Sequence, residues 1–110
     1  MADIEMVRGE TLDLEIAVVD GDGDEVDLLG HTVEWRLSTG MERSTADDSI
    51  TIAGNLARLR IAPADTLALP NRERVYHYEA KVMNSAGVVK CVIEGDLTIT
   101  PTLVELEPAD

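Results

Sequence analysis

Hydrophobic and polar residues alternate over most of the chain with a period of two residues. Between Arg74 and Thr100, two such runs flank the short polar turn 84–87, which ends in Gly87. Alternation of this kind is typical of strands with one buried face, and a short turn ending in glycine is typical of a hairpin. We therefore predict a hairpin whose inward side chains are Tyr76, Tyr78, Ala80, Val82, Val89, Cys91, Ile93, Leu97 and Ile99.

The N-terminal half repeats this pattern. Residues 11–18 and 31–38 both alternate, and Trp35 is the largest residue on the inward face of the second run. The turn 20–25 between them is rich in glycine and aspartate, which favour tight turns, so it predicts a second hairpin. Residues 49–52 and 56–61 flank Gly54 and predict a third.

The remaining segments are less regular. Residues 40–48 are polar, with mixed charges that predict a loop or a ragged edge strand. Pro63 interrupts the strand pattern, and residues 67–70 predict one helical turn that ends at Pro70. About six to eight short strands, separated by turns every 8–12 residues or so, are typical of a β-sandwich or a barrel.

The length of 110 residues predicts a single domain, 1–110, with its core over about residues 5–101 and a C-terminal tail at 102–110. The net charge of −13 opposes binding to nucleic acid and to anionic membranes. The first 30 residues are the most acidic part, since Arg8 is their only basic residue. The sequence contains neither a signal-peptide pattern nor a membrane-length apolar run, so we expect the protein in the cytoplasm unless an assembly carries it out.

The acidic turn raises the question of calcium, because a hard cation prefers several oxygen ligands from one loop. An EF-hand loop beginning at Asp20 would need glycine where the chain has Glu25, and glutamate where it has His31. The sequence thus favours a solvated turn and predicts neither a metal nor a cofactor. The weak calcium candidates are Asp20, Asp22, Asp24 and Asp27.

The sequence also argues against an enzyme. Cys91, the only cysteine, is predicted to point inward, whereas His77 on the same hairpin points outward, so the two are not placed for nucleophilic catalysis. One cysteine and two histidines without close spacing do not predict a zinc site. Carboxylates are numerous enough that counting alone does not exclude a glycosidase-like pair, but all three aromatic residues are predicted in the core, leaving no exposed rings for a sugar.

Several segments together resemble one family. They are Arg-Gly-Glu-Thr at 8–11, Asp-Gly at 22–23, the stretches 26–33 and 35–37, Ile-Ala-Pro-Ala-Asp-Thr at 61–66, Tyr-His-Tyr-Glu at 76–79, Gly87, and Gly-Asp-Leu-Thr-Ile-Thr-Pro at 95–101. This pattern is similar to that of small all-β domains in phage and prophage tail and baseplate proteins, in particular the N-terminal domain of baseplate upper proteins. The resemblance covers about residues 5–102, and it departs at Leu29, where such domains often carry threonine. In larger relatives the domain is fused to others.

The resemblance implies an immunoglobulin-like antiparallel β-sandwich and a non-enzymatic virion structural protein of the tail or baseplate. Such a protein acts through assembly with other virion proteins or with itself, in the host cytoplasm first and then in the virion tail. The alternative is an immunoglobulin-like binding module for a host receptor, a polysaccharide or a partner protein. The uneven charge and the apolar tail residues nominate contact surfaces in the acidic first third and at Leu103, Val104, Leu106, Arg72 and Arg74.

Overall fold

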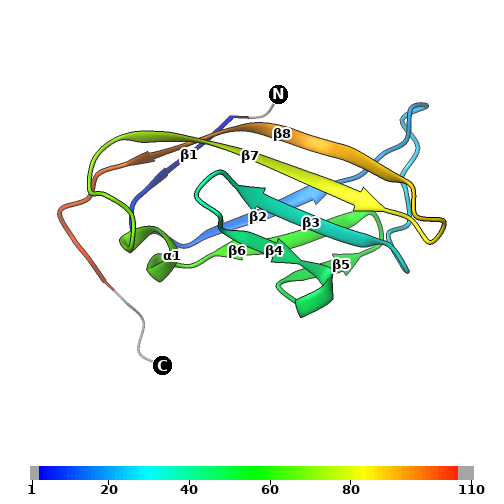
Figure 1. The fold of residues 1–110 in the computed structure, drawn as a ribbon, viewed down its shortest axis with the longest axis horizontal. Coiled ribbons are helices and arrows are strands. Elements are labelled where there is room, and N and C mark those ends of the chain that lie inside the picture. Colours follow the sequence, from blue (N-terminus) through cyan, green and yellow to red (C-terminus); the bar gives the residue numbers. More distant parts are fainter. Residues whose placement is uncertain (1–2, 107–110) are drawn as a thin grey trace.

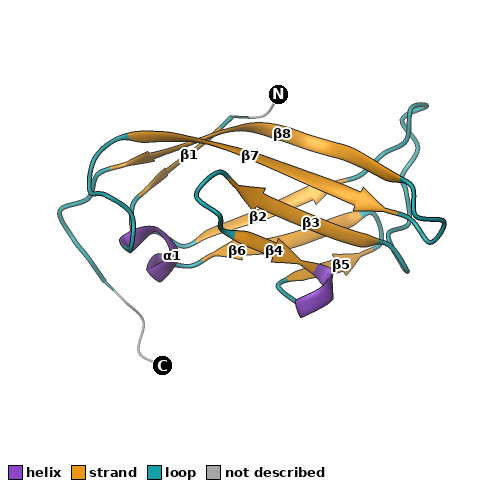
Figure 2. Ribbon diagram, viewed as in Figure 1, coloured by secondary structure: helices purple, strands orange, loops and turns teal. Residues whose placement is uncertain are grey.

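Two β-sheets pack face to face (Figures 1 and 2). The computed structural model describes residues 3–106, and within them the chain forms eight strands. The larger sheet has the order β1 (Ile4–Val7), β8 (Val89–Thr100), β7 (Arg74–Met83), β3 (Thr32–Leu37) and β4 (Glu42–Ser44). The smaller sheet has the order β2 (Leu12–Ala17), β6 (Leu56–Ile61) and β5 (Ile50–Ala53). The predicted all-β sandwich is therefore confirmed.

One pairing corrects the expectation of an antiparallel fold. Strand β1 pairs with β8 in parallel, with Ile4 opposite Leu97 and Val7 opposite Thr100, whereas the other strand pairs are antiparallel. The sequence pattern missed β1 because four residues are too few to show a period. Its partner also lies near the other end of the chain, where no turn signal connects the two strands.

The inward faces of both sheets form the core. Trp35 and Tyr78 are almost completely buried, and their ring centroids lie 6.1 Å apart. Burying one large apolar side chain contributes about 1.5–3 kcal/mol, so the inward face predicted for β3 and most of β7 carries much of the stability. The largest fully buried side chains are Trp35, Tyr78, Leu28, Ile61, Leu97, Ile99, Val33 and Thr66.

A bulge corrects the predicted inward face of β8. The hairpin of β7 and β8 is present, but Ala80 lies opposite Ile93 while Lys81 lies opposite Cys91, which leaves Val92 as an extra residue. One extra residue reverses the alternation beyond it. Cys91 and Val89, predicted inward, are therefore exposed.

The single turn of helix α1 spans Pro63–Leu67, earlier than the predicted 67–70. Proline suits the first position of a helix, because the N–H that it lacks would have no helical partner there. The Asp65 carboxylate accepts the Ala62 N–H at 2.7 Å and completes the helix start. Pro63 thus begins the helix instead of only ending the preceding strand.

The acidic turn departs from its prediction, whereas the edge strand within residues 40–48 and the hairpin around Gly54 match theirs. The acidic turn brings Val19 and Glu25 together in one isolated bridge instead of a full hairpin, and the chain then crosses to β3 in the other sheet. The polar segment 40–48 contains the edge strand β4 and the 3-10 helix η1 (Thr45–Asp47). The predicted hairpin around Gly54, formed by β5 and β6, is confirmed.

Candidate functional site

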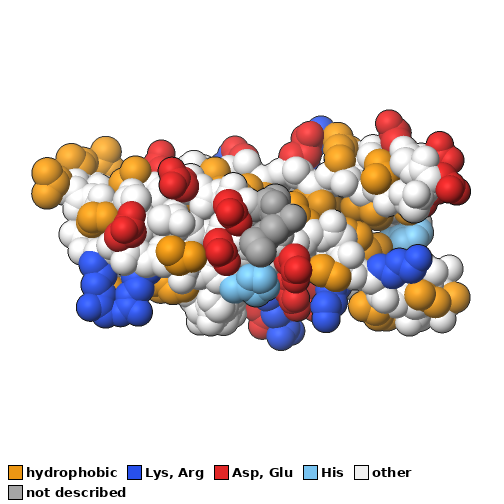
Figure 3. Space-filling model, turned by 90° about the horizontal axis from the view of Figure 1, so that it is seen from above, with side chains coloured by type: hydrophobic (Ala, Val, Ile, Leu, Met, Phe, Trp, Pro, Cys, Tyr) orange, Lys and Arg blue, Asp and Glu red, His pale blue; other side chains and the backbone are white. Residues whose placement is uncertain are grey.

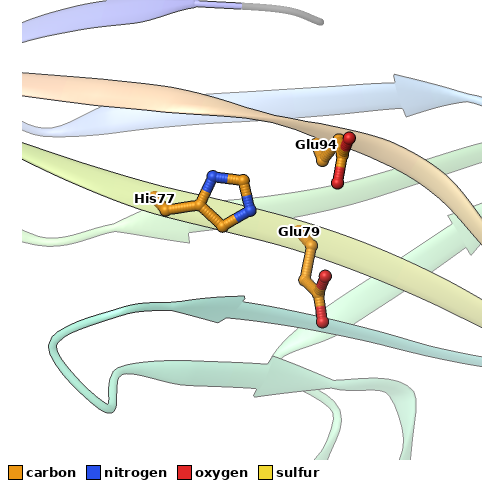
Figure 4. Close-up of side chains that lie close together, drawn as sticks. All are labelled: His77, Glu79 and Glu94. Carbon is orange, nitrogen blue, oxygen red and sulfur yellow. The ribbon is translucent and has the colours of Figure 1, made fainter.

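Three side chains with metal-binding atoms meet on the outer face of the larger sheet (Figure 4). His77 and Glu79 lie two residues apart on β7 and so share a face, and Glu94 on β8 lies directly opposite Glu79. One ligand atom from each residue lies within 4.8 Å of the others. In the described part of the chain, this is the only such group of three or more His, Cys, Asp or Glu residues.

Neighbouring charges account for much of this cluster without a metal. Lys81 Nζ lies 3.7 Å from Glu79 Oε1, and Arg36 on β3 is the cross-strand neighbour of Glu79. His77 Nδ1 lies 3.7 Å from Asp96 Oδ1. An imidazole and two carboxylates are suitable ligands for a divalent cation. Because His77 and Glu94 are solvent-exposed and cations already neighbour Glu79, the cluster by itself does not define a metal centre.

The carboxylates of the acidic turn do not converge on one point. Asp20 Oδ1 accepts the backbone N–H groups of Asp22 and Asp24 at 2.9 and 3.0 Å, and Asp27 Oδ1 accepts that of Leu29 at 3.0 Å. These bonds are the local turn-forming contacts that aspartate commonly makes. The turn thus resembles a self-capped loop, and the preference for a solvated turn over a calcium site stays a prediction.

The bulge changes the relation between Cys91 and His77. The two were predicted on opposite faces, but Cys91 lies opposite Lys81, on the same outer face as His77. His77 is four residues from Lys81, or about 13 Å along an extended strand. That separation exceeds the hydrogen-bond reach needed for a nucleophile and its base. His31 lies elsewhere, with Nδ1 3.4 Å from the Leu29 carbonyl oxygen.

The predicted interface residues gather at one end of the molecule. Arg8 is largely buried there and donates hydrogen bonds to the carbonyl oxygens of Leu67 and Leu69, while it also pairs with Glu105. Asn71 and Thr102 exchange two hydrogen bonds. These contacts fix the segment 102–105 against the body of the protein. The apolar side chains that remain exposed are Leu103, Val104 and Leu106.

Arg72 and Arg74 lie beside this segment and are exposed. Within residues 3–106 neither forms an ion pair, whereas the arginines at positions 8, 36, 43, 58 and 60 each pair with a carboxylate. Figure 3 shows hydrophobic and basic side chains together at the left end of the molecule. We call the exposed residues Arg72, Arg74, Leu103, Val104 and Leu106 the tail patch.

The opposite end carries a second apolar feature. Valines from the acidic-turn region and from the β7–β8 hairpin line a hollow of about 180 Å³. Val19 and Val88 at its rim are each about half exposed. We call this feature the valine hollow; its valines are Val18, Val19, Val26, Val82, Val88 and Val92. Sequence reasoning missed it, because Val92 reaches it only through the bulge.

No family model matches the chain, and neither does any curated protein. Within the described residues, no helix has the length and apolar character needed to cross a membrane.

Proposed function

We propose that this chain is a non-enzymatic structural protein of a phage or prophage virion. It acts as a tail or baseplate component through contacts with copies of itself or with other tail proteins. The observation that carries the proposal is the pair of exposed apolar features at the two ends, each beside charges that no ion pair neutralises within the described residues. Exposed apolar patches rimmed by charge are typical of protein–protein contacts. The family resemblance is what points to a virion.

The charge distribution supports an assembly role. A net charge of −13 favours solubility and disfavours nonspecific association of free subunits in the host cytoplasm. Apolar contact area at the ends then supplies affinity once the correct partner is close. Free subunits are in this way kept apart until they meet a growing tail or baseplate.

Mass spectrometry of purified particles tests the proposal. The particles are prepared after induction of the prophages of the source strain, and peptides of this chain are counted relative to the major tail protein. We expect the copy number of this chain to stand in a fixed, low ratio to that of the major tail protein. Absence from the particles, with the protein present in the lysate, would contradict the structural role.

Deletion of residues 102–110 is a second test of the same role. The fold should persist, because the described part of this segment holds to the body through surface contacts with Asn71 and Arg8. Incorporation into particles should fall, since Leu103, Val104 and Leu106 are lost. Circular dichroism checks the fold, and normal incorporation of the shortened chain would count against the tail as a contact surface.

The second candidate function is an immunoglobulin-like binding module for a host receptor, a polysaccharide or a partner protein. The exposed Arg72 and Arg74 favour it, because arginine is enriched at binding hot spots. Arg43 does not add to such a surface, because it pairs with Asp65 at 2.6 Å. A chain that is free in the lysate and loses host-surface binding when both arginines become alanine would support the module.

A further inference from the structure

We propose that copies of this chain associate head to tail, with the tail patch of one copy seated on the valine hollow and acidic turn of the next. The inference rests on the proposed assembly function and adds to it the partner, the two surfaces and their direction. The partner is a second copy of the same chain.

The position of the two surfaces carries the first step. The molecule extends 46 Å along its longest axis. Figure 1 shows the start of β7, helix α1 and the described C-terminal segment at one end, and the loop after β2 and the β7–β8 turn at the other. A contact between two different surfaces is heterologous, and it builds a closed ring or an open filament instead of a twofold dimer.

The apolar groups provide the second step. Leu103, Val104 and Leu106 project from a segment whose backbone is already fixed by the Asn71–Thr102 and Arg8–Glu105 contacts. A segment held in place before binding loses less conformational entropy when it docks. The valine hollow is a concave surface lined mainly by valines, together with His31, Asn84 and Lys90, and its volume of about 180 Å³ can accept a branched side chain.

The charges provide the third step. The Asn71–Thr102 hydrogen bonds place Arg72 next to the apolar segment, and the Val19–Glu25 bridge places the acidic turn next to the valine hollow. The carboxylates of this turn form no ion pair within the described residues; they belong to Asp20, Asp22, Asp24 and Glu25. Figure 3 shows acidic side chains at the right margin, with a basic side chain near the same end.

Within the described residues, the tail patch thus presents two unpaired guanidinium groups, with the exposed carboxylate of Glu73 between them in the chain. The acidic turn, within the same residues, presents four unpaired carboxylates beside a hollow that Lys90 also lines. Complementary charges across a contact orient the partners and speed their encounter. An acidic turn beside the hollow disfavours nucleic acid or an anionic surface as the occupant. The tail patch of a second copy supplies both the apolar side chains and the two guanidinium groups.

Sedimentation of two charge-reversed variants tests the proposal. Arg72→Glu with Arg74→Glu alters the tail patch, and Asp22→Lys with Asp24→Lys alters the acidic turn while leaving Asp20 and Asp27 to cap it. We expect each variant alone to associate about tenfold or more weakly than the unmodified chain, and the difference to shrink at high salt.

Mixing the two variants gives the sharpest result. Each retains one intact surface, so a head-to-tail contact forms between the intact tail patch of the second variant and the intact hollow end of the first. The mixture should recover association, and because the two reversed surfaces carry opposite charges to each other, they do not oppose further growth. A twofold contact would give no such complementation, because both partners would need the same intact surface.

Two controls separate the contact from general effects. Arg58→Glu with Arg60→Glu makes the same charge change on β6, in the middle of the smaller sheet, and should leave association unchanged. Because it also breaks the pairs with Glu15 and Asp13, the variant is compared at a temperature where it is fully folded. Leu103→Ser with Val104→Ser removes apolar groups without changing charge, and it should weaken association at all salt concentrations. Thermal unfolding of each variant verifies that it is folded.

The proposal is overturned if the unmodified chain stays monomeric up to about 1 mM. It is also overturned if both charge-reversed variants associate normally, or if their mixture does not recover association. Particle composition distinguishes this from the proposed function. If charge-reversed chains enter particles at normal copy number, the head-to-tail contact is contradicted and the virion role stands. If the unmodified chain associates in solution but is absent from particles, the virion role is contradicted and the head-to-tail contact stands.

Discussion

The smaller sheet matches opposite charges across its outer face, whereas the larger sheet places two glutamates opposite each other. On β2 and β6, Asp13 lies opposite Arg60 and Glu15 opposite Arg58, and both pairs form ion pairs. On β7 and β8, Glu79 lies opposite Glu94. Directly opposed like charges destabilise a sheet, and opposed unlike charges stabilise it.

This difference indicates where each sheet gets its strand register. In the smaller sheet, the outer charges and the inner apolar residues favour the same register. In the larger sheet, register is set from inside, where the buried rings of Trp35 and Tyr78 lie near each other. Its outer face combines opposite-charge neighbours, Glu34 with Lys81 and Arg36 with Glu79, with the like-charge pair of Glu79 and Glu94.

Replacing Trp35 should produce the largest effect and test whether the larger sheet is held from inside. Trp35→Ala is expected to cost about 3–5 kcal/mol of unfolding free energy in chemical denaturation. The Trp35 Nε1 donor is buried without a hydrogen-bond acceptor among the described residues. Trp35→Phe removes that donor and keeps most of the apolar volume, so it should cost less than about 2 kcal/mol.

A matched change in the smaller sheet completes this test. Ile52 on β5 is only partly buried, so Ile52→Ala should cost about 1–2 kcal/mol. A Trp35→Ala loss no greater than that of Ile52→Ala would show that the inner face of the larger sheet is not the main support.

The turn between β1 and β2, where the chain passes from one sheet to the other, should give the next largest effect. Gly9 has φ +86°, and an added Cβ would lie 3.0 Å from Leu67 Cδ2. Gly9→Ala is therefore expected to cost about 1–2 kcal/mol, since non-glycine residues are strained in this region. Thermal unfolding measures it, with Gly54→Ala as a control that has positive φ but open space around the Cβ. Equal losses in both variants would exclude a contribution from the Leu67 contact.

The outer charges should give smaller effects of opposite sign in the two sheets. Glu94→Gln removes the like-charge pair with Glu79 and should raise the unfolding free energy by about 0.2–0.5 kcal/mol. Glu15→Gln breaks the pair with Arg58 and should lower it by a similar amount. Denaturant unfolding at low salt resolves the two signs. A loss of stability in Glu94→Gln would mean that this carboxylate supports the fold.

Acid unfolding should show the smallest effect, at the Asp13–Arg60 pair of the smaller sheet. Hydrogen bonds from Arg60 hold the pKa of Asp13 below its usual value. A lowered folded-state pKa means that ionised Asp13 stabilises the fold above its unfolded pKa of about 3.9, and that this contribution disappears as the pH falls through the lower folded value. Stability measured between about pH 5 and pH 2 should therefore fall slightly less in Asp13→Asn than in the unmodified chain. If the unfolding free energy falls equally steeply with pH in both proteins, the Asp13–Arg60 pair does not contribute to stability in solution.

The alternating pattern predicted the parts of the fold that depend on local sequence. Period-two alternation predicted the inward faces of β2 and β3 and the buried positions of Trp35 and Tyr78. Turn residues predicted the β5–β6 and β7–β8 hairpins. Gly95 continues the inward face of β8 between Ile93 and Leu97, and it is buried opposite Tyr78. Such features need only information from neighbouring residues.

The surfaces were only partly predictable. The sequence nominated Arg72, Arg74 and the apolar tail residues, because arginines in a loop and apolar residues in a polar tail can be recognised from residue type alone. It did not place them at the same end, which depends on the contacts of Asn71 with Thr102 and of Arg8 with Glu105. The His77, Glu79 and Glu94 cluster also depends on strand register.

By itself, the sequence determined an all-β chain with a buried tryptophan and an acidic first third, because alternation, turn chemistry and net charge are local or additive properties. Tertiary structure decided the parallel pairing of β1 with β8 and the bulge at Val92 that turns Cys91 outward. It also decided the position of the valine hollow and the tail patch at opposite ends. These features join residues far apart in the chain, and their energies are set by packing and register that no local pattern contains.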